Sequence, residues 1–340
     1  MSLFIDKLYN TRFHLEDLSK HSFLVTGGAG FIGSNLVEYL LKYGAGHVRV
    51  LDNFSNGYIE NIKDFLALPN FTLIDGDIRD IDTCKLAVEG VDFISHQAAL
   101  GSVPRSINDP ITTNEVNVGG FLNMMVAAND SLSLKRFVYA ASSSTYGDSL
   151  ALPKVEGYEG NPLSPYAVTK LMNEVYADVF NKVYNFHSIG LRYFNIFGPK
   201  QNPNNPYAAV IPIFCENVIN EMPLVINGDG NTSRDFTFVE NAVQANIKAF
   251  FTKDITKHDV YNVACGDEIS LNDLVEFLQD LSGKDLNVIH RQERMGDVKH
   301  SRASIEKIAA DLNYYPLINF RDGLSIVFEW YKKSKGTSSK

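Results

Sequence analysis

The sequence predicts an α/β protein built on a doubly wound parallel sheet, with a smaller mixed α/β lobe toward the C-terminus. Two observations predict this fold class. Short apolar runs rich in β-branched residues recur through the first half of the chain, and between them apolar residues repeat at the i, i+3, i+4 spacing of helices. Strict alternation of strand and helix is typical of the βαβ units that form parallel sheets.

Six runs are expected to be buried strands: residues 22–26, 47–52, 71–75, 91–97, 135–143 and 187–194. Helical spacing is clearest in FIGSNLVEYLLKYG (31–44) and EVNVGGFLNMMVAAND (115–130). After about residue 196 the alternation stops, and a stretch rich in Pro, Asn and Gly follows. We therefore predict a short amphipathic lead-in helix at 1–20, a core domain at 21–195, and a smaller lobe at 196–335 from which some chain returns to the core.

The composition excludes several classes of protein. Apolar residues make up 45% of the 340 residues, enough for a sizeable core, and the net charge is −9 without a basic run, so nucleic acid is not an expected partner. The three cysteines lie far apart and in no metal-ligand spacing, which predicts reduced thiols, no metal and a cytoplasmic location. No apolar run approaches the ~18 residues of a membrane span, and the N-terminus does not resemble a signal peptide.

A glycine-rich turn stands between the first expected strand and the first expected helix. FLVTGGAGFIGSNLVEYLL places Gly27, Gly30 and Gly33 there in the spacing G-x-x-G-x-x-G. The free N–H groups and the positive dipole end of a helix N-terminus favour a pyrophosphate, and glycines let the backbone approach it. Alone this pattern is weak, because such a turn can also be purely structural.

A carboxylate at the end of the second strand sharpens the interpretation. Asp52 lies 19 residues beyond Gly33, where it can accept hydrogen bonds from the adenosine ribose and would repel a 2′-phosphate, which favours NAD over NADP. The alternative for Asp52 is an ordinary turn former at a strand end. We predict that the core is a Rossmann domain for NAD. Further cofactor contacts are expected at Phe31, Ile32, Asn53, Asp77, Ile78, Gln97, Ala98 and Ala99.

The stretch ASSSTYGDSLALPKVEGYEGNPLSPYAVTK carries the reactive groups. Tyr166 and Lys170 are i and i+4 on an expected helix, so their side chains share one face. To act as a base at neutral pH the phenol must lose roughly 3 units from its pKa of ~10, which corresponds to about 4 kcal/mol. A nearby ammonium and the cation of a nicotinamide can supply this. The hydroxyls of Ser142, Ser143 and Ser144, at the end of a strand, are expected to face the same substrate alcohol.

Tyr-x-x-x-Lys alone occurs by chance in many helices, but chance does not explain its order after the glycine loop, Asp52 and the serines. TGGAGFIGS, LDN, HQAAL, NEVNVGG, AASSSTYGD, SPYAVTK and LRYFNIFGP resemble the extended branch of the short-chain dehydrogenase/reductase superfamily. Within that branch the chain, from about residue 22 to 330, is similar to the UDP-hexose 4-epimerases and most similar to the UDP-N-acetylglucosamine 4-epimerase type.

The resemblance implies a reaction and roles for the central residues. Tightly held NAD⁺ oxidises C4 of a UDP-sugar, the 4-keto sugar rotates, and the hydride returns to the opposite face. Tyr166 is the implied base, Lys170 lowers its pKa and holds the nicotinamide ribose, and Ser142 is the catalytic hydroxyl. Sugar-nucleotide dehydratases place Asp-Glu directly after the catalytic Thr, whereas Ser143 and Ser144 stand here and would contact the sugar. Decarboxylases of the family have a Glu among these positions, which is absent here. The resemblance therefore argues against both a dehydratase and a decarboxylase.

The family's remaining contacts map onto both halves of the chain. The resemblance implies that Asn117 and Phe194 touch the cofactor; their alternatives are a polar contact inside a helix and a core aromatic. The implied substrate contacts are Gly101, Ser102, Asn195, Gln201, Ala209 and Val210, together with Arg234 and Arg294 for the diphosphate and Asp297 for the uridine ribose. The planar fork of arginine suits bidentate phosphate contacts.

One position in the family controls the size of the sugar. It corresponds to Ser301, where enzymes that exclude N-acetyl groups have a tyrosine, and Gly101 stands where many epimerases have a lysine. The small residues predict interconversion of UDP-N-acetylglucosamine and UDP-N-acetylgalactosamine. The alternatives are the same reaction on UDP-N-acetylhexosaminuronic acids, whose acid Arg105 could pair with, or on UDP-glucose and UDP-galactose. Other hypotheses are a net oxidoreductase using soluble NAD and a non-catalytic NAD sensor. Two helices with apolar residues on more than one face predict a homodimer.

Overall fold

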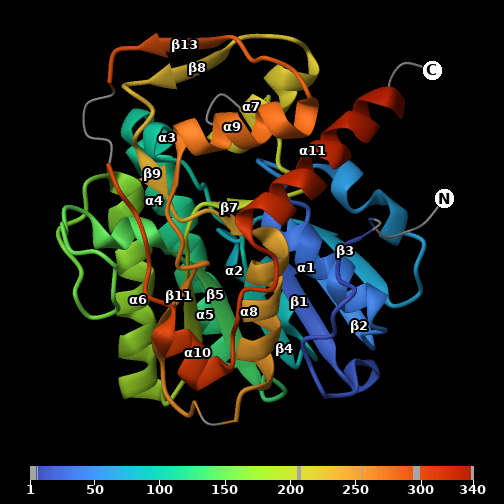
Figure 1. Cartoon of the computed structure of the whole chain (residues 1–340). Coiled ribbons are helices and arrows are strands. Elements are labelled where there is room, and N and C mark those ends of the chain that lie inside the picture. Colours follow the sequence, from blue (N-terminus) through green and yellow to red (C-terminus); the bar gives the residue numbers. More distant parts are fainter. Residues whose placement is uncertain (1–4, 6, 205–207, 254, 294–298, 338–340) are drawn as a thin grey trace.

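A parallel sheet of seven strands lies at the centre of the computed structural model, which describes all residues except 1–4, 6, 205–207, 254, 294–298 and 338–340 (Figure 1). Its strand order is β11-β6-β5-β4-β1-β2-β3, and every neighbouring pair is parallel. The strands are β1 (Ser22–Thr26), β2 (His47–Asp52), β3 (Phe71–Asp75), β4 (Phe93–His96), β5 (Arg136–Ser142), β6 (Ser188–Tyr193) and β11 (Asp259–Val263). The predicted doubly wound sheet is confirmed, and all six expected strands are present.

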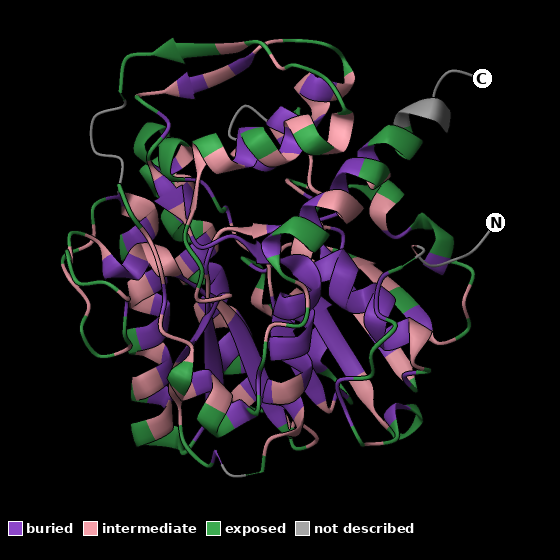
Figure 2. Ribbon diagram, viewed as in Figure 1, coloured by how far each residue is buried: buried purple, intermediate pink, exposed green. Residues whose placement is uncertain are grey.

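Helices cover both faces of the sheet. Helices α1 (Phe31–Lys42) and α8 (Val239–Phe251) contact each other on one face, while α2 (Ile81–Val88), α5 (Phe121–Asn129) and α6 (Pro165–Tyr184) lie on the other. In β1, Phe23 and Val25 belong to the first core and Leu24 to the second, as the alternation of a strand requires. Figure 2 shows that the central strands are buried, whereas the edge strand β3, expected to be buried, is partly exposed.

The expected helix at 115–130 is less regular than its periodicity suggests. Its first part is a π-helical turn, η4 (Glu115–Gly120), and α5 follows directly. The short helices α3 (Val103–Asn108) and α4 (Pro110–Asn114) precede it. The remaining single turns are η1 (Leu18–Lys20), η2 (Ile59–Asn61), η3 (Lys63–Phe65) and η5 (Ser143–Tyr146).

The second half of the chain forms the smaller mixed α/β region and also completes the core. This region holds α7 (Val210–Ile219), α9 (Leu271–Ser282) and α11 (Phe320–Thr337), with the strand pairs β8–β13 (Leu224–Asn227, Val288–Arg291) and β9–β12 (Ser233–Arg234, Ile269–Ser270). The pair β7–β10 (Ile196–Phe197, Thr237–Phe238) connects it to the core, and α10 (Glu306–Leu312) contacts β11. The predicted boundary near residue 195 stays a prediction.

The expected lead-in helix at 1–20 is wrong for the residues that the structure describes there. Only the 3-10 turn η1 is helical, and Lys7 and Tyr9 have positive φ angles of 74° and 54°. Backbone groups of this segment bond to side chains of α1: Phe13 N–H donates to the Tyr39 hydroxyl at 2.7 Å, and the Leu8 carbonyl accepts from Lys42 at 2.7 Å. The amphipathic spacing of this N-terminal segment therefore reflects how its apolar side chains pack against α1, and not a helix.

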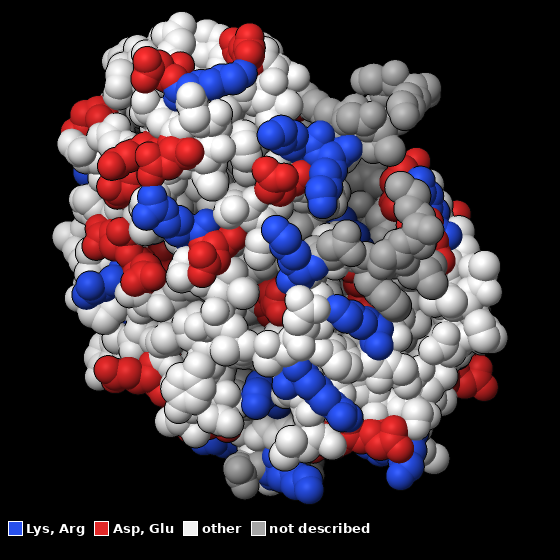
Figure 3. Space-filling model, turned by 45° about the vertical axis from the view of Figure 1, so that its right-hand side comes forward, with Lys and Arg blue, Asp and Glu red and all other residues white. Residues whose placement is uncertain are grey.

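Surface and composition features agree with an ordinary globular protein. On the face shown in Figure 3, basic side chains are interspersed with acidic and uncharged ones. Among the described residues, no helix has both the length and the apolar character needed to cross a bilayer. The same part of the chain contains no group of three or more His, Cys, Asp or Glu side chains suited to a metal ion. Cys84, Cys215 and Cys265 are free thiols.

Candidate active site

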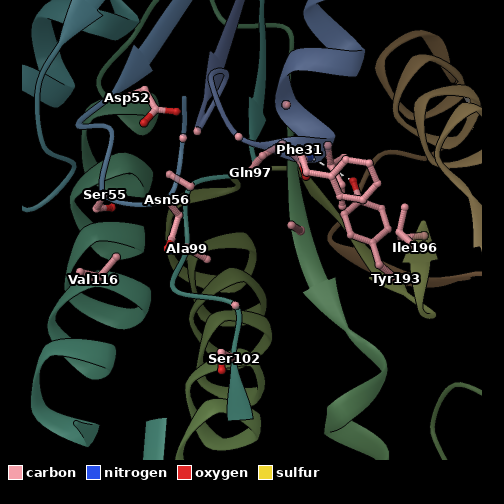
Figure 4. Close-up of a pocket in the computed structure, with 18 of the residues that line it drawn as sticks. Phe31, Asp52, Ser55, Asn56, Gln97, Ala99, Ser102, Val116, Tyr193 and Ile196 are labelled. Atoms are coloured by element: carbon pink, nitrogen blue, oxygen red, sulfur yellow. Dashed lines mark hydrogen bonds between the residues drawn. The ribbon is translucent and has the colours of Figure 1, made fainter. Parts of the chain in front are cut away.

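A cavity of about 540 Å³ opens at the carboxyl ends of the central strands. Ligands of open α/β sheets bind at this edge, where the strand order reverses beside β1. Figure 4 shows residues from the start of α1, from the loops after β2 and β4, from η4, from the end of β6 and from β7 around this space. The predicted site residues that line it are Gly27, Gly30, Phe31, Ile32, Gly33, Asp52, Asn53, Asp77, Ile78, Gln97, Ala98, Ala99, Gly101, Ser102, Ser142, Ser143, Tyr166, Lys170, Asn195, Gln201 and Ala209.

The glycine loop after β1 has glycines that the turn requires and also backbone N–H groups that could bind a phosphate. Gly27 has a φ of +66°, and a Cβ there would lie 2.8 Å from the backbone of Ala98. A Cβ on Gly33 would lie 2.2 Å from the carbonyl oxygen of Gly27. These two glycines are required by the turn itself. Gly30 is the N-cap of α1 and provides no side-chain cap, so the first N–H groups of the helix face the cavity as a cradle for phosphate.

Asp52 ends β2 at the cavity wall. Its side chain is 7% exposed, and its carboxylate accepts from the N–H of Ala29 at 2.9 Å and of Phe54 at 2.8 Å. Burial raises the pKa of Asp52, and these two N–H donors oppose that shift. The held carboxylate keeps lone pairs for ribose hydroxyls and would repel a 2′-phosphate, so the residues present fit NAD.

The loops after β2 and β3 are joined beside Asp52. The amide of Asn53 donates to Asp77 at 2.9 Å, and Asp77 also pairs with Arg79 at 2.7 Å. The hydrogen bond to Arg79 has the largest effect, and together these bonds lower the pKa of Asp77 to about 2. Asp77 and Ile78 therefore form a fixed wall at the adenine end predicted for the cofactor.

Tyr166 and Lys170 project from the first turns of α6. The helix begins with Ser164 as its N-cap, whose hydroxyl accepts from Ala167 N–H at 3.1 Å. The ammonium of Lys170 is buried and donates to the carbonyl of Ala140, in β5, at 2.7 Å. Burial lowers the pKa of Lys170 to about 8, and the carboxylate of Glu174 opposes this. The two residues are brought together at the end of β5, as predicted.

The serine cluster lies beside them. Ser142 is 8% exposed, and its hydroxyl accepts from the Ser144 hydroxyl at 2.9 Å and from the Ser144 N–H at 3.2 Å. Ser142 and Ser143 line the cavity, whereas Ser144 is not among the lining residues and bonds Ser142. Ser144 is thus placed to orient the Ser142 hydroxyl.

The pKa of Tyr166 is raised in the protein without its cofactor. Burial raises it above 10, and hydrogen bonding with the Ser142 hydroxyl opposes the rise. The ammonium of Lys170 bonds the carbonyl of Ala140, and no lowering by Lys170 accompanies this arrangement. Burial thus outweighs the hydrogen bond to Ser142, and the lowering expected with the nicotinamide cation in place stays a prediction.

Comparison with known proteins shows the family of the chain. The model of the NAD dependent epimerase/dehydratase family matches residues 23–264, which hold the glycine loop, Asp52, Ser142 and the Tyr166–Lys170 pair. The chain belongs to this family. The predicted family and NAD as its cofactor are thereby confirmed.

Individual relatives of the epimerase are similar over almost their whole length. A putative UDP-glucose 4-epimerase of Methanocaldococcus jannaschii is 33% identical over 316 residues, 92% of this chain and 99% of the relative. The structure of UDP-N-acetylglucosamine 4-epimerase from Methanobrevibacter ruminantium in complex with UDP-N-acetylmuramic acid is 35% identical, with a TM-score of 0.87 over 92% of this chain and 99% of that one. UDP-glucuronic acid 4-epimerase from Bacillus cereus, in complex with UDP-glucuronic acid and NAD, is 29% identical, with a TM-score of 0.85 over 92% and 99%.

Several predicted contacts of the epimerase lie outside the cavity lining. Asn117 is buried and accepts from Leu100 N–H at 2.7 Å, so it holds the loop that carries Gly101. Phe194 is fully buried beside Tyr146, Ala264 and Ala303, which matches the core-aromatic alternative. Val210 begins α7 and is not among the lining residues.

Arg234 and Ser301, two predicted contacts from the C-terminal half, also lie outside the cavity lining. Arg234 donates to the carbonyls of Ser233 at 2.8 Å and Lys299 at 3.3 Å. The Ser301 carbonyl accepts from Asp235 N–H at 2.7 Å, next to Arg234 along the chain. Arg294 and Asp297 lie outside the described residues. The diphosphate and uridine contacts implied for this half of the chain therefore stay predictions.

Other lining residues are not assigned by the sequence analysis. They include Ser55, Asn56, Gly57, Tyr58, Val116, Tyr193, Ile196, Lys200 and Asn202. The small residues Ser55, Asn56 and Gly57 could have been predicted from the sequence, because they closely follow Asp52. The loop after a strand that ends in a ligand-binding carboxylate lies at the same edge of the sheet as that carboxylate. Tyr193 gives no such signal; its hydroxyl accepts from Gln97 at 3.0 Å and from Asn246 at 2.8 Å.

Proposed function

We propose that this NAD-dependent UDP-sugar 4-epimerase interconverts UDP-N-acetylglucosamine and UDP-N-acetylgalactosamine. The observation that carries the choice of sugar is the open space at Gly101, where an added Cβ would meet no heavy atom within 4 Å. An acetamido group needs such room, and a bulky side chain would overlap it. The small residue Ser301 and the similarity to a UDP-N-acetylglucosamine 4-epimerase support the same choice.

The site residues then have distinct tasks. Bound NAD⁺ would supply the hydride acceptor and donor for C4 of the sugar, and a positive charge that favours the ionised phenol. Tyr166 takes the proton of the C4 hydroxyl as that oxygen becomes a carbonyl and gives it back later. Ser142, oriented by Ser144, holds the same oxygen, and the ammonium of Lys170, fixed at the Ala140 carbonyl, would hold the nicotinamide ribose.

A second candidate substrate is a UDP-N-acetylhexosaminuronic acid. The guanidinium of Arg105 lines the cavity and donates to Asn56 at 2.9 Å, which places a cation within the pocket. A carboxylate at C6 of the sugar is the group that such a cation would favour. Both candidates share the N-acetyl group and the same chemistry at C4.

One assay with a matched variant tests the choice of sugar. Turnover of UDP-N-acetylglucosamine, UDP-N-acetylglucosaminuronate and UDP-glucose is compared for the wild type and for Ser301→Tyr. We expect the N-acetylated sugars to be preferred by the wild type and to lose about 10-fold or more in kcat/KM in the variant, while UDP-glucose is retained. A wild type that prefers UDP-glucose over both would overturn the proposal.

We further propose that the enzyme is a cytoplasmic homodimer that pairs through α6. Val168, Val175, Val179 and Val183 are exposed on this helix, at 47%, 46%, 43% and 64%, and their spacing places them along one side. A stripe of exposed valines is typical of a helical interface. Sedimentation of the wild type and of Val179→Glu tests this, and a monomeric wild type would contradict it.

A further inference from the structure

The loop that follows β7 forms one wall of the active-site cavity. Lys200, Gln201 and Asn202 line the cavity there. Lys200 has a φ of +70°, a left-handed conformation that a non-glycine residue keeps only when its surroundings hold it. The position of this wall therefore depends on the contacts that the loop makes with the rest of the molecule.

Three successive residues of the loop are held from outside. The Pro199 carbonyl accepts from the side-chain amide of Asn35 at 3.1 Å. The ammonium of Lys200 pairs with Glu38 at 2.8 Å, and the side chains of both residues are nearly buried, at 9% and 1% exposure. The Gln201 carbonyl accepts from the hydroxyl of Tyr331 in α11. Two of the three contacts thus come from α1.

Each of these two α1 side chains is fixed in turn by the N-terminal segment, defined here as residue 5 and residues 7–17. The hydroxyl of Tyr9, which is fully buried, donates to the Asn35 side-chain oxygen at 2.7 Å. This bond sets which way the amide faces, and its NH₂ group then meets the Pro199 carbonyl. The Ile5 N–H donates to one carboxylate oxygen of Glu38 at 2.6 Å, while the other oxygen pairs with the ammonium of Lys200.

The N-terminal segment precedes the residues matched by the family model, which begin at 23. We propose that this segment is a positioning element of the active site: Tyr9, through Asn35, and the Ile5 backbone, through Glu38, set the loop wall that carries Lys200 and Gln201. None of its described residues lines the cavity, so it acts on the substrate only through α1 and the loop.

Paired variants separate this role from simple stabilisation. Tyr9→Phe removes the hydroxyl on the path to the loop and keeps the buried ring. Tyr43→Phe is the matched control, since the Tyr43 hydroxyl donates to the Tyr9 carbonyl at 2.9 Å and fastens the same segment to α1 without a bond to the loop. The measurements are amide hydrogen exchange of residues 196–204, and KM and kcat with the UDP-sugar that turns over fastest.

We expect Tyr9→Phe to speed exchange in 196–204 by about 10-fold and to raise KM about 5-fold with kcat changed less than about 2-fold, and Tyr43→Phe to alter neither. The KM readout rests on the proposed function, whereas the exchange readout needs no turnover and remains valid if the proposed sugar is wrong. Equal effects of the two variants, or none from Tyr9→Phe, would overturn the proposal. If Tyr9→Phe does not fold, Glu38→Gln tests the second contact with the same readouts.

Discussion

The ammonium of Lys170 donates to the backbone carbonyl of Ala140 at 2.7 Å, which ties the cation of α6 to the end of β5 beside Ser142. The bond has a direct consequence for the chemistry. Lys170 is a fixed charge one helical turn from Tyr166, and the pKa of Tyr166 is nevertheless raised by burial. Ionisation of the phenol is therefore expected to be coupled to binding of the positively charged cofactor.

Tyr166→Phe tests the base directly. Without the hydroxyl the C4 proton has no acceptor on α6, so we expect kcat to fall by about 10²–10⁴-fold. NAD retention should stay close to wild type, because the ring and Lys170 remain. Tyr158→Phe, at an exposed tyrosine outside the cavity, is the control and should not change kcat. Undiminished activity of Tyr166→Phe would refute the assignment.

Lys170→Met should change how stability depends on pH. The pKa of Lys170 falls from 10.5 to about 8 on folding, so between these values the unfolded chain binds a proton that the folded one has lost. Stability from this group then rises with pH across that window. We expect the free energy of unfolding of the wild type, relative to Lys170→Met, to increase from about pH 8 to about pH 10.5 in urea titrations of the cofactor-free protein. A flat difference would contradict the lowered pKa.

Glu174→Gln should shift the activity of the enzyme along the pH axis. Glu174 lies one turn beyond Lys170 in α6, is 7% exposed, and pairs through both oxygens with Arg192 at 2.9 and 2.6 Å. Its carboxylate raises the pKa of Lys170, so removing the charge should lower that pKa further. We expect the alkaline limb of the kcat/KM profile to move to lower pH.

The control for this variant is Glu159→Gln. Glu159 pairs with the same Arg192 but is not among the groups that shift the pKa of Lys170. A general disturbance of the Arg192 ion pairs would change both profiles alike, and that result would rule out an electrostatic effect of Glu174 on Lys170.

The features that were predictable from the sequence are those fixed by short-range spacing. β1, β2 and β3 have the predicted bounds because each is a short run rich in apolar and β-branched residues, although β3, at the sheet edge, is only partly buried. The cofactor and catalytic residues that come from strand ends and from the start of α6 also reach the cavity, because parallel strands present their carboxyl ends at one edge.

What was missed depends on partners far away in the chain. The segment around Tyr9 has helical spacing, yet its hydrogen bonds go to α1 side chains such as Asn35, so long-range contacts override the local pattern. Lys200 enters the site from an irregular loop whose conformation is set by Glu38 and Tyr331. The raised pKa of Tyr166 likewise depends on burial, which motif spacing does not describe.

Asp52→Asn should weaken cofactor binding while retaining the side-chain shape. The carboxylate accepts two backbone N–H bonds on different oxygens, from Ala29 and Phe54, and an amide can accept on only one of them. Hydrogen bonds to a charged group contribute about 1.5–3 kcal/mol each, so the loss of the carboxylate toward the ribose should raise the NAD dissociation constant about 10- to 100-fold. Nucleotide released on denaturation, quantified per chain, measures this. Asp75→Asn, at the exposed end of β3, provides the control: it should leave NAD content unchanged, and a wild-type NAD content in Asp52→Asn would mean that Asp52 serves only the turn.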